Sequence, residues 1–394
     1  MPSPVVLLAS LPAALAATLY VSPTGSSSGT GTLESPYASI QTAVDKAAAG
    51  DIISLRGGTY KPTKNISIKK SGTAGAYYTL TAYGDESVTI DGEALTGTPA
   101  ELNGSLDRAD RGVLHFEGTS YWNVSKITLV NGPYGVYLQD GSNNIFDRIV
   151  THDNYESGFQ MQGSLSNNQI LYLDSYMNRD PRKNGESADG FACKEGSGTG
   201  NIIKGARLWN NVDDGLDLWE FASPVTIEDT ISWGNGFNRW DFTPFEGDGN
   251  GYKLGGGSTT KANHVVTNSI AFSNSAKGFT DNKQPGAFTF TRNTAYKNGG
   301  VGFQLTGATG VTGKFSKNVA ALNSGGSTAQ ADQTSLKGAT SSGNSWDAST
   351  KWTDASFKSV DISLVQGKRG SNGKVPASSF LAPASGDAIG ATIA

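Results

Sequence analysis

Three aspartates lie close together in the stretch NNVDDGLDLWEF, which spans residues 210–221: Asp213, Asp214 and Asp217. Carboxylates at this spacing repel one another, and a fold gains nothing from gathering them unless a positive charge lies among them. A hard cation bound by carboxylate oxygens would supply that charge and could also stabilise negative charge that develops on a substrate. The spacing therefore predicts a cation site, and its remaining ligands depend on how the chain folds around it.

The composition of the chain favours a β-rich fold with frequent turns. Of the 394 residues, 17% are charged and 37% are hydrophobic. The 51 glycines make up about 13% of the chain, nearly twice the usual share of about 7%. The net charge of −4 is mild, so nothing indicates a nucleic-acid partner. The single cysteine, Cys193, excludes an internal disulfide, and we expect its side chain to lie in the core.

The first residues, MPSPVVLLASLPAALAATLY, are typical of a secretory signal. An apolar run ends in small residues at Ala17, and Ala14-Leu15-Ala16 fits a cleavage site. The run is too short to span a bilayer, and no later stretch is apolar enough to do so. We therefore predict a signal peptide at residues 1–17, an extracellular protein that does not associate with membranes, and a single domain at residues 18–394.

A short pattern recurs along the chain. A glycine is followed by a large apolar residue, a variable residue and, in six of seven copies, a second apolar residue. Apolar residues on either side of a variable one indicate a strand with one buried face. The seven copies begin at Gly135, Gly158, Gly190, Gly215, Gly251, Gly278 and Gly302.

The spacing of these copies predicts the fold. The glycines are 23, 32, 25, 36, 27 and 24 residues apart. A strand–turn–strand unit of roughly 22–25 residues with insertions at one place is typical of a β-solenoid, whose coils stack at about 4.8 Å. We therefore predict an all-β, right-handed parallel β-helix with a ladder of asparagine side chains between its coils. The recurring asparagines, four residues before the glycine, are Asn131, Asn154, Asn211, Asn274 and Asn298.

The open sheet edges at both ends of the solenoid are expected to be covered by other segments of the chain. Residues 40–48 have helical spacing and are predicted to form an N-terminal helix that caps the open sheet edges. The first coil is expected to begin at Asp51. The repeats are clearest over residues 122–323, and the Ser-, Gly- and Ala-rich tail at residues 324–394 is expected to pack along the outside and to cover the last coil.

Equivalent positions of a solenoid lie over one another, so the repeat brings distant residues together. Asp217 and Lys253 both stand two residues after the glycine in consecutive coils and are expected to point outward. Asp189 and Asp214 both stand directly before the glycine, again in consecutive coils, and Asp213 precedes Asp214. Four carboxylates and one lysine are therefore predicted to meet. Oxygen ligands select a hard ion, and the loose geometry of Ca²⁺ suits this set better than zinc, which prefers histidine and cysteine.

Two insertions enter the repeat at one corner, in the coils that flank this patch. The spacing from Asn178 to Gly190 is 12 residues and that from Asn235 to Gly251 is 16, against four in the regular copies. Loops beside a rigid scaffold usually carry function. These loops carry Arg179, Arg182, Lys183, Arg239 and Trp240.

Lys253 has two interpretations. It could form a salt bridge with Asp217, and each aspartate could simply stabilise a turn, since aspartate is common before glycine. Alternatively, a bound Ca²⁺ would offset the negative charge and repel the ammonium, which would lower the lysine pKa from its reference of about 10.4. A lysine of lowered pKa can act as a general base. Four stacked carboxylates with one lysine favour the second interpretation.

Three segments resemble the motifs of the family 9 polysaccharide lyases, the pectate lyases of that family: Ala188-Asp-Gly-Phe191, Asn211-Val-Asp-Asp-Gly-Leu-Asp217 and Gly251-Tyr-Lys-Leu-Gly255. The likeness covers most of the chain after the signal. It implies a Ca²⁺ site made by Asp189, Asp213, Asp214 and Asp217, and it implies Lys253 as the Brønsted base acting on homogalacturonan. Some members of the family act on rhamnogalacturonan, which leaves the preferred substrate open.

The expected reaction is a β-elimination. Lys253 would remove the C5 proton of a uronic acid while Ca²⁺ draws charge from the neighbouring carboxylate, and the C4 oxygen would leave without uptake of water. Basic residues near the groove would hold other carboxylates of the substrate. We expect Lys194, which projects outward beside Trp219 of the next coil, to rank ahead of the loop residues in this role, although a plain surface lysine is an equal interpretation. The loop candidates are Arg179, Arg182 and Arg239.

Two other classes of protein remain open at this point. A β-helix glycoside hydrolase would also use clustered aspartates, one as acid and one as base beside a water. The Gly-His-Gly that the pectin hydrolases of this fold carry is absent from the sequence. A non-catalytic, Ca²⁺-stabilised binding protein would gain nothing from Lys253 in the patch. The expected partner is pectate, the acidic polysaccharide of plant cell walls, bound by a monomer.

Overall fold

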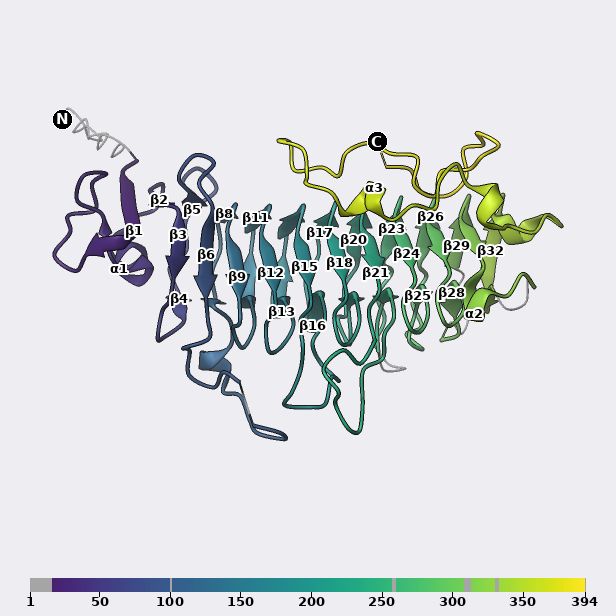
Figure 1. Ribbon diagram of the computed structural model, residues 1–394, viewed down its shortest axis with the longest axis horizontal. Helices are drawn as coiled ribbons and strands as arrows, with labels where there is room; N and C mark the ends of the chain where they lie inside the picture. Colours follow the sequence, from purple (N-terminus) through teal and green to yellow (C-terminus); the bar gives the residue numbers. More distant parts are fainter. Residues whose placement is uncertain (1–15, 100, 257–259, 308–312, 330–332, 394) are drawn as a thin grey trace, which may run out of the picture.

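The computed structural model describes residues 16–99, 101–256, 260–307, 313–329 and 333–393. In these residues the chain winds into three sheets of parallel strands, and each complete coil from β2 onward adds one strand to each sheet (Figure 1). This is the predicted parallel β-helix. The predicted signal peptide at residues 1–17 falls almost wholly outside the described residues. Within them, no helix is long and apolar enough to cross a membrane.

Sheet A contains twelve strands. They are β1 (Thr18–Ser26), β2 (Ile52–Leu55), β5 (Tyr78–Ala82), β8 (Trp122–Ser125), β11 (Ile145–Asp147), β14 (Gln169–Leu171), β17 (Asn201–Lys204), β20 (Val225–Glu228), β23 (Val265–Thr267), β26 (Thr289–Thr291), β29 (Gly313–Ser316) and β32 (Ala339–Ser342).

Sheets B and C contain ten strands each. Sheet B consists of β3 (Gly58–Tyr60), β6 (Val88–Asp91), β9 (Thr128–Val130), β12 (Val150–His152), β15 (Asp174–Tyr176), β18 (Arg207–Trp209), β21 (Ile231–Trp233), β24 (Ile270–Phe272), β27 (Thr294–Tyr296) and β30 (Val319–Ala321). Sheet C consists of β4 (Ile66–Ile68), β7 (Leu114–Glu117), β10 (Val136–Ser142), β13 (Phe159–Ser166), β16 (Phe191–Ser197), β19 (Leu216–Asp217), β22 (Tyr252–Lys253), β25 (Phe279–Thr280), β28 (Phe303–Leu305) and β31 (Thr334–Leu336).

Short helices lie outside the sheets. In the described residues they are α1 (Ile40–Lys46), α2 (Asn323–Gly326) and α3 (Ser363–Gln366), together with 3₁₀ turns at Arg108–Asp110, Ser345–Asp347 and Asp354–Ser356.

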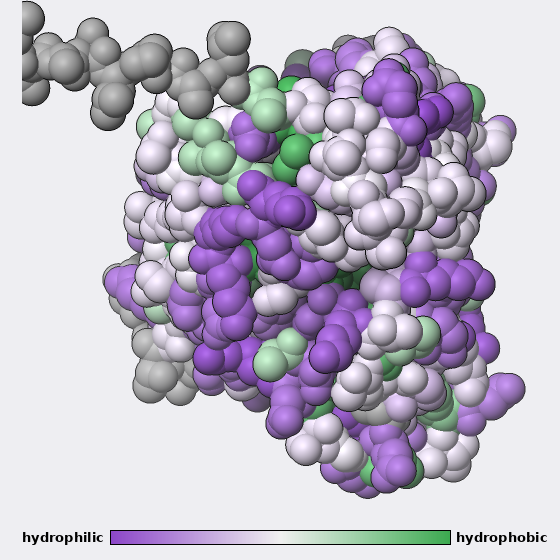
Figure 2. Space-filling model, turned by 90° about the vertical axis from the view of Figure 1, so that its left-hand side faces the viewer, coloured by the Kyte–Doolittle hydropathy of each residue, from purple (hydrophilic) through white to green (hydrophobic). Residues whose placement is uncertain are grey.

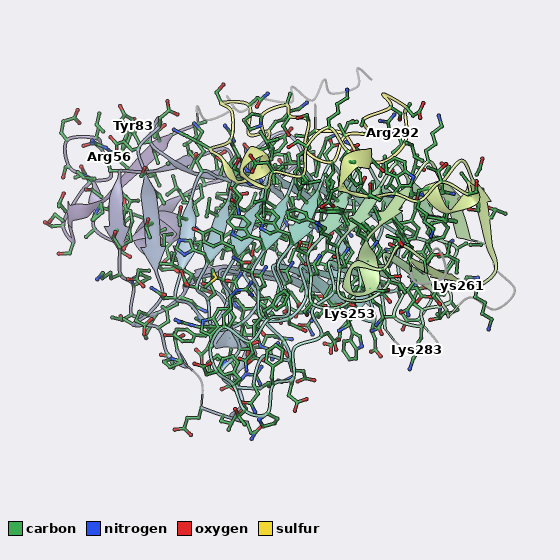
Figure 3. All side chains as sticks on the ribbon, turned by 45° about the vertical axis from the view of Figure 1, so that its right-hand side comes forward. Arg56, Tyr83, Lys253, Lys261, Lys283 and Arg292 are labelled. Atoms are coloured by element: carbon green, nitrogen blue, oxygen red, sulfur yellow. The ribbon has the colours of Figure 1, made fainter. Side chains whose placement is uncertain are left out.

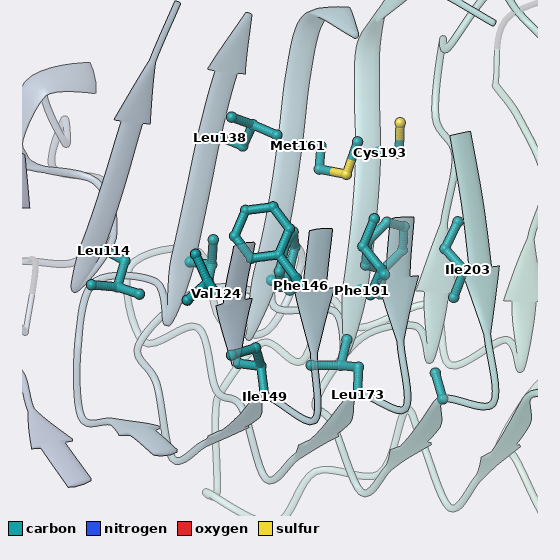
Figure 4. Close-up of a cluster of buried hydrophobic side chains, with 14 of the residues drawn as sticks. Leu114, Val124, Leu138, Phe146, Ile149, Met161, Leu173, Phe191, Cys193 and Ile203 are labelled. Atoms are coloured by element: carbon teal, nitrogen blue, oxygen red, sulfur yellow. The ribbon is translucent and has the colours of Figure 1, made fainter. Parts of the chain in front are cut away.

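Alternation along the strands fills the solenoid with rows of apolar side chains. Leu138, Met161 and Cys193 are in register on neighbouring strands of sheet C, and Figure 4 shows their side chains in one row that faces the interior. Cys193 is buried, and burial raises the pKa of its thiol. Its core position is as predicted, because the residue alternates with the outward positions of the same strand.

Buried ladders of asparagine join the coils at their turns, and a short one runs through Asn293, Asn318 and Asn344. In one ladder, Asn178 Nδ2 donates to Asn211 Oδ1 at 2.8 Å, and Asn211 Nδ2 donates to Asn235 Oδ1 at 3.0 Å. The backbone N–H of each residue donates to the same side-chain oxygen of the next coil, as at Asn211 N to Asn235 Oδ1 (3.0 Å). A second ladder runs through Asn144, Asn168 and Asn201. The ladders satisfy buried amides that would otherwise be costly.

The prediction that Asn131 belongs to the ladder is wrong. The backbone N–H of Gly132 donates to Asn154 Oδ1 at 3.1 Å, so Gly132 occupies the ladder position of that coil. Asn131 instead has a left-handed backbone (φ 54°) and donates to Asp91. The turn before Gly135 is one residue shorter than in the regular coils. Counting back four residues from Gly135 therefore gives Asn131, although the ladder position is that of Gly132.

The N-terminal end of the solenoid is closed by α1, as predicted, although this helix ends at Lys46 and not at residue 48. It buries Ile40, Ala43 and Val44 against the first coils. The stack begins earlier than Asp51, because β1 pairs in parallel with β2. Figure 2 looks at this end and shows a mostly hydrophilic and neutral surface, with few strongly apolar residues.

The tail lies along the outer face of sheet B, on the side opposite to the longest loops (Figure 1). Apolar residues of the tail such as Phe357 and Phe380 form a buried cluster with outward residues of β21, β24 and β27. A buried carboxylate holds the tail in place, since Asp174 accepts hydrogen bonds from both Arg207 and Arg369 at 2.6 Å. Strands β31 and β32 continue the stack beyond residue 323.

Candidate functional site

The register of sheet C brings the aspartates and Lys253 together. Asp217 is paired with Lys253 on one side and with Ala192 on the other. The backbone N–H of Asp214 donates to Asp189 Oδ1 at 3.3 Å, which places the two residues before the glycines in contact. Carboxylate oxygens of Asp189, Asp214 and Asp217 lie within 4.8 Å of one another, and those of Asp213, Asp214 and Asp248 form a second such group.

The four aspartates face away from the core but are covered by the loops, so that each is 0–1% exposed. In two of these aspartates, one carboxylate oxygen accepts a hydrogen bond from a backbone N–H group. Asp213 Oδ1 accepts from Asp248 N at 2.6 Å, and Asp217 Oδ1 accepts from Trp219 N at 2.9 Å. The other oxygen of Asp213, Asp214 and Asp217 is buried without a hydrogen bond among the described residues. Of these three oxygens, Asp214 Oδ2 and Asp217 Oδ2 lie within ion-pair distance of a lysine, whereas Asp213 Oδ2 has no ion pair among the described residues.

Burial and mutual repulsion make these carboxylates hard to ionise. Burial, followed by nearby carboxylates, raises the pKa of Asp189 to about 7 and that of Asp214 to about 6, against the opposing effect of the lysines. The pKa of Asp213 is also raised well above its ordinary value, by burial first and then by Asp214 and Asp189. A cation among these groups would reverse this effect by favouring the ionised form.

Two ammonium groups flank the cluster. Lys194 Nζ lies 2.8 Å from Asp189 Oδ2 and 2.7 Å from Asp217 Oδ2. Lys253 Nζ lies 2.8 Å from Asp248 Oδ2, 3.4 Å from Asp214 Oδ2 and 3.6 Å from Asp217 Oδ2. Asp217 Oδ2 therefore has charge contacts with both lysines but no hydrogen bond of good geometry.

Without a cation, the carboxylates hold both lysines in the charged form. Burial lowers the pKa of Lys253, but Asp217, Asp214, Asp213 and Asp248 outweigh it, so the net pKa is raised. The pKa of Lys194 is likewise raised above its ordinary value, because Asp189 and Asp217 outweigh the effect of burial. Lowering of the Lys253 pKa by a bound cation stays a prediction.

The predicted substrate-binding residues separate into two groups. Arg182, Lys194 and Trp219 line one groove together with Lys253, and the groove has a volume of about 630 Å³. Arg179 lies elsewhere, with its guanidinium 4.3 Å from the centre of the Tyr155 ring. Arg239 is also outside the groove lining and donates to Asn210 Oδ1 at 2.9 Å. Lys194, predicted to project outward and bind substrate, has its ammonium 2.8 Å from Asp189 and 2.7 Å from Asp217.

The two inserted loops form the wall of the groove and are fixed by specific contacts. Arg182 Nε donates to the buried carboxylate of Glu156 at 2.6 Å, and its carbonyl oxygen accepts from Asn103 N at 2.8 Å. The second loop is joined to the first where Glu246 N donates to Asn184 O at 3.1 Å. Figure 3 labels Lys253 on the side of the solenoid that carries these loops.

Several residues at the site were missed from the sequence. Asp248 lies in the second insertion, where the repeat register gives no position, so no pattern pointed to it. Gln160 and Gln162 also line the groove. The register could have identified Gln160, because it occupies the same outward row as Asp217 and Lys253. Arg111 lines the groove as well, although it comes from a loop well before the clearest repeats.

Comparison with known proteins agrees with this arrangement. The family model described as "Pel9A-like, right handed beta helix region" matches residues 19–323 of the chain. The chain is 60% identical to "Pectate lyase PEL9" of Emericella nidulans, over 98% of this chain and 97% of that protein. It is 34% identical to "Pectate lyase L" of Dickeya chrysanthemi, over 91% of this chain and 81% of that protein.

Comparison with a solved structure also shows this fold over nearly the whole chain. The crystal structure of pectate lyase Pel9A superposes with a TM-score of 0.81 at 31% identity, covering 95% of this chain and 90% of that one. The right-handed sense of the predicted solenoid is thereby confirmed. The chain belongs to the Pel9A-like right-handed β-helix proteins of polysaccharide lyase family 9.

Proposed function

We propose that this polysaccharide lyase is a secreted, Ca²⁺-dependent pectate lyase that cleaves homogalacturonan by β-elimination as a monomer. The observation that carries the proposal is the convergence of four buried aspartates with two lysines that line one groove. The pectate lyases PEL9 and Pel9A among its relatives support the substrate class. The signal-like residues 1–17 support secretion.

The aspartates fit a divalent cation. Three of their oxygens are buried without a hydrogen bond in the described chain, and these oxygens belong to the groups of carboxylates that lie within 4.8 Å of one another. Five carboxylates, counting Asp248, face the two ammonium groups of Lys194 and Lys253. The surplus of negative charge favours a divalent ion, and ligands that are all oxygen favour Ca²⁺. Asp189, Asp213, Asp214 and Asp217 would hold it.

Lys253 is better placed than Lys194 to lose its proton. Lys194 makes two short contacts with buried carboxylates, and these hold its charge firmly. The contacts of Lys253 with Asp214 and Asp217 are longer, at 3.4 and 3.6 Å. Its short contact is with Asp248, whose side chain is 57% exposed, so solvent screens that attraction. Once the buried carboxylates bind a cation, Lys253 loses most of the charge that keeps it protonated.

Each residue of the site then has a distinct role in the reaction. When bound, Ca²⁺ would supply positive charge beside a substrate carboxylate and make the adjacent C5 proton more acidic. Lys253 Nζ, in its neutral form, takes the C5 proton. The electron pair of that C–H bond forms the C4–C5 double bond as the C4–O bond breaks toward the leaving sugar. Lys194 remains charged and orients Asp189 and Asp217, while Trp219 provides an apolar wall.

The test is the ultraviolet absorbance of unsaturated product from polygalacturonate, methylated pectin and rhamnogalacturonan, each with Ca²⁺ and with chelator. We expect product from polygalacturonate in the presence of Ca²⁺. Faster product formation from rhamnogalacturonan would retain the mechanism and change the substrate. New reducing ends without absorbance would indicate a hydrolase, and binding without any turnover would indicate a non-catalytic protein.

A further inference from the structure

We propose that Arg111 forms a distal subsite that binds a carboxylate of the polyuronide chain several sugars away from the bond cleaved at Lys253. The inference rests on the proposed function, since it assigns a further part of the same groove to the same substrate. It concerns a residue that lies outside the clearest repeats and that makes no contact with the aspartate cluster.

A row of residues on five strands of sheet C underlies the groove. Gln160, Asp217 and Lys253 of this row line the groove, while Tyr137 and Ala192 are fully buried. The row runs in register through Tyr137, Gln160, Ala192, Asp217 and Lys253. Four strand spacings of about 4.8 Å separate the first residue from the last, or about 19 Å. A linear polymer in the groove would pass from the aspartate cluster over the two glutamines to Arg111, which packs against the buried Tyr137 ring.

Arg111 lies at the far end of this row. Its guanidinium carbon is 5.4 Å from the centre of the Tyr137 ring, and its Nη1 donates to Tyr137 Oη at 3.2 Å. Its Nε donates to the carbonyl of Leu106 at 3.4 Å. Gly112, which follows, permits the close approach: a Cβ there would meet the Tyr137 backbone N at 2.9 Å, and its φ is +84°. The guanidinium is thus oriented from two sides and still lines the groove.

The charge balance of the groove singles out this residue. In the described part of the chain, five cations line the groove, and four of them already contact a carboxylate. Arg182 pairs with Glu156, Lys183 with Glu186, and both Lys194 and Lys253 with the aspartate cluster. The hydrogen bonds of the Arg111 side chain among the described residues are with a phenol hydroxyl and a backbone carbonyl, both neutral. Glu156, which acts to raise the pKa of Arg111, already pairs with Arg182.

An arginine oriented in this way can bind a carboxylate of the substrate. Its remaining N–H groups form a planar fork that matches the two oxygens of a carboxylate. Ordering by Tyr137 and Leu106 reduces the conformational freedom that the side chain would lose on binding. A polyuronide carries one carboxylate per sugar, so a second cationic subsite on the same strand row would hold the chain in register at a distance from Lys253.

The experiment measures binding of oligogalacturonates of increasing length by calorimetry, in the full chain with Lys253→Ala to prevent turnover. Short oligomers that cannot extend from Lys253 to Arg111 should bind equally with and without Arg111→Ala. Oligomers long enough to reach Arg111 should lose roughly tenfold in affinity in the Arg111→Ala variant. Arg111→Lys should fall between the two, because it keeps the charge and loses the fork.

Arg108→Ala is the matched control. Arg108 lies three residues earlier in the same loop and pairs with Glu117 at 3.0 Å, so its loss should leave affinity unchanged at every length. Equal affinity of wild type and Arg111→Ala for the longest oligomers would overturn the subsite. A loss that is the same for short and long oligomers, together with a lower melting temperature, would assign Arg111 to loop structure only. A wild-type protein without lyase activity would contradict the proposed function, while the length-dependent binding would still decide the role of Arg111.

Discussion

Lys194 and Lys253 contact the same oxygen from opposite sides: their Nζ atoms lie 2.7 and 3.6 Å from Asp217 Oδ2. The two lysines come from strands on either side of β19, so Asp217 lies between two positive charges in neighbouring coils. A cation bound by Asp217 would weaken both contacts. The effect should be larger for Lys253, because Lys194 is also held by Asp189 at 2.8 Å.

The first prediction separates the two lysines. Lys253→Ala should lower kcat by about 10²–10⁴-fold, the usual contribution of a general base. Lys253→Arg should be almost as inactive, because a guanidinium stays protonated. Lys194→Ala should lower activity less and should change the affinity for Ca²⁺, since it frees Asp189 and Asp217. Initial rates of unsaturated product and calorimetric Ca²⁺ titrations measure these effects. If Lys194→Ala lost more activity than Lys253→Ala, the assignment of the base would have to be exchanged.

The second prediction concerns removal of the metal. Excess chelator should abolish activity, and added Ca²⁺ should restore it, because the carboxylates alone cannot neutralise a substrate carboxylate. The circular dichroism spectrum should change little, since the apolar rows and asparagine ladders hold the coils without the cluster. Asp213→Ala, Asp214→Ala, Asp217→Ala and Asp189→Ala should each weaken Ca²⁺ binding. Unchanged affinity in all four variants would refute the proposed ligand set.

The third prediction is a pH dependence of stability in the absence of Ca²⁺. The pKa values of Asp189 and Asp214 are raised in the folded chain to about 7 and about 6. The folded state therefore binds more protons than the unfolded state between about pH 4 and about pH 7, and its stability falls as the pH rises through that window. Buried Glu156, whose pKa burial raises to about 7, acts in the same direction.

Melting temperatures in chelator between pH 5 and pH 8 test this dependence. They should fall with rising pH, and Asp189→Asn should flatten the decline because it removes one of the raised groups. Ca²⁺ should stabilise the protein more at pH 8 than at pH 5, since the ion binds the ionised carboxylates. A melting temperature in chelator that stays constant or rises over this range would contradict the raised pKa values.

The repeat explains why so much of the site could be predicted from the sequence. A solenoid converts spacing along the chain into stacking in space, so the positions of Asp217 and Lys253 relative to their glycines were enough to pair them. The same logic placed Asp189 beside Asp214. Asn131 shows the limit, because one residue missing from a turn moved the ladder position to Gly132.

Contacts made by the loops could not be predicted in this way. Asp248 approaches Lys253 to 2.8 Å from an insertion that has no repeat position. Arg179 and Arg239 were predicted as groove residues because they are basic and lie in the inserted loops. Their side chains contact local partners instead, the Tyr155 ring and Asn210. Burial of the aspartates also depends on the loops, since alternation alone indicated only that their side chains point outward.

The last prediction tests the ladder that supports the site from beneath. Asn211 is fully buried: its Oδ1 accepts from Asn178 N and Nδ2, and its Nδ2 donates to Asn235 Oδ1 and Ser175 O. Asn211→Ala should leave buried amide groups of the neighbouring coils without partners, at about 1–3 kcal/mol for each unsatisfied group. The variant should unfold at lower denaturant concentration than wild type.

Because Val212, Asp213 and Asp214 follow Asn211 directly, the same change should also weaken Ca²⁺ binding by loosening the turn that carries two of the ligands. Asn263→Ala is the control: Asn263 is exposed and accepts one hydrogen bond, from Ala287 N at 2.8 Å, so its loss should cost little. Denaturant unfolding and Ca²⁺ titration of both variants measure the two effects. If Asn211→Ala were as stable as Asn263→Ala, the ladder would contribute alignment of the coils and not free energy of folding.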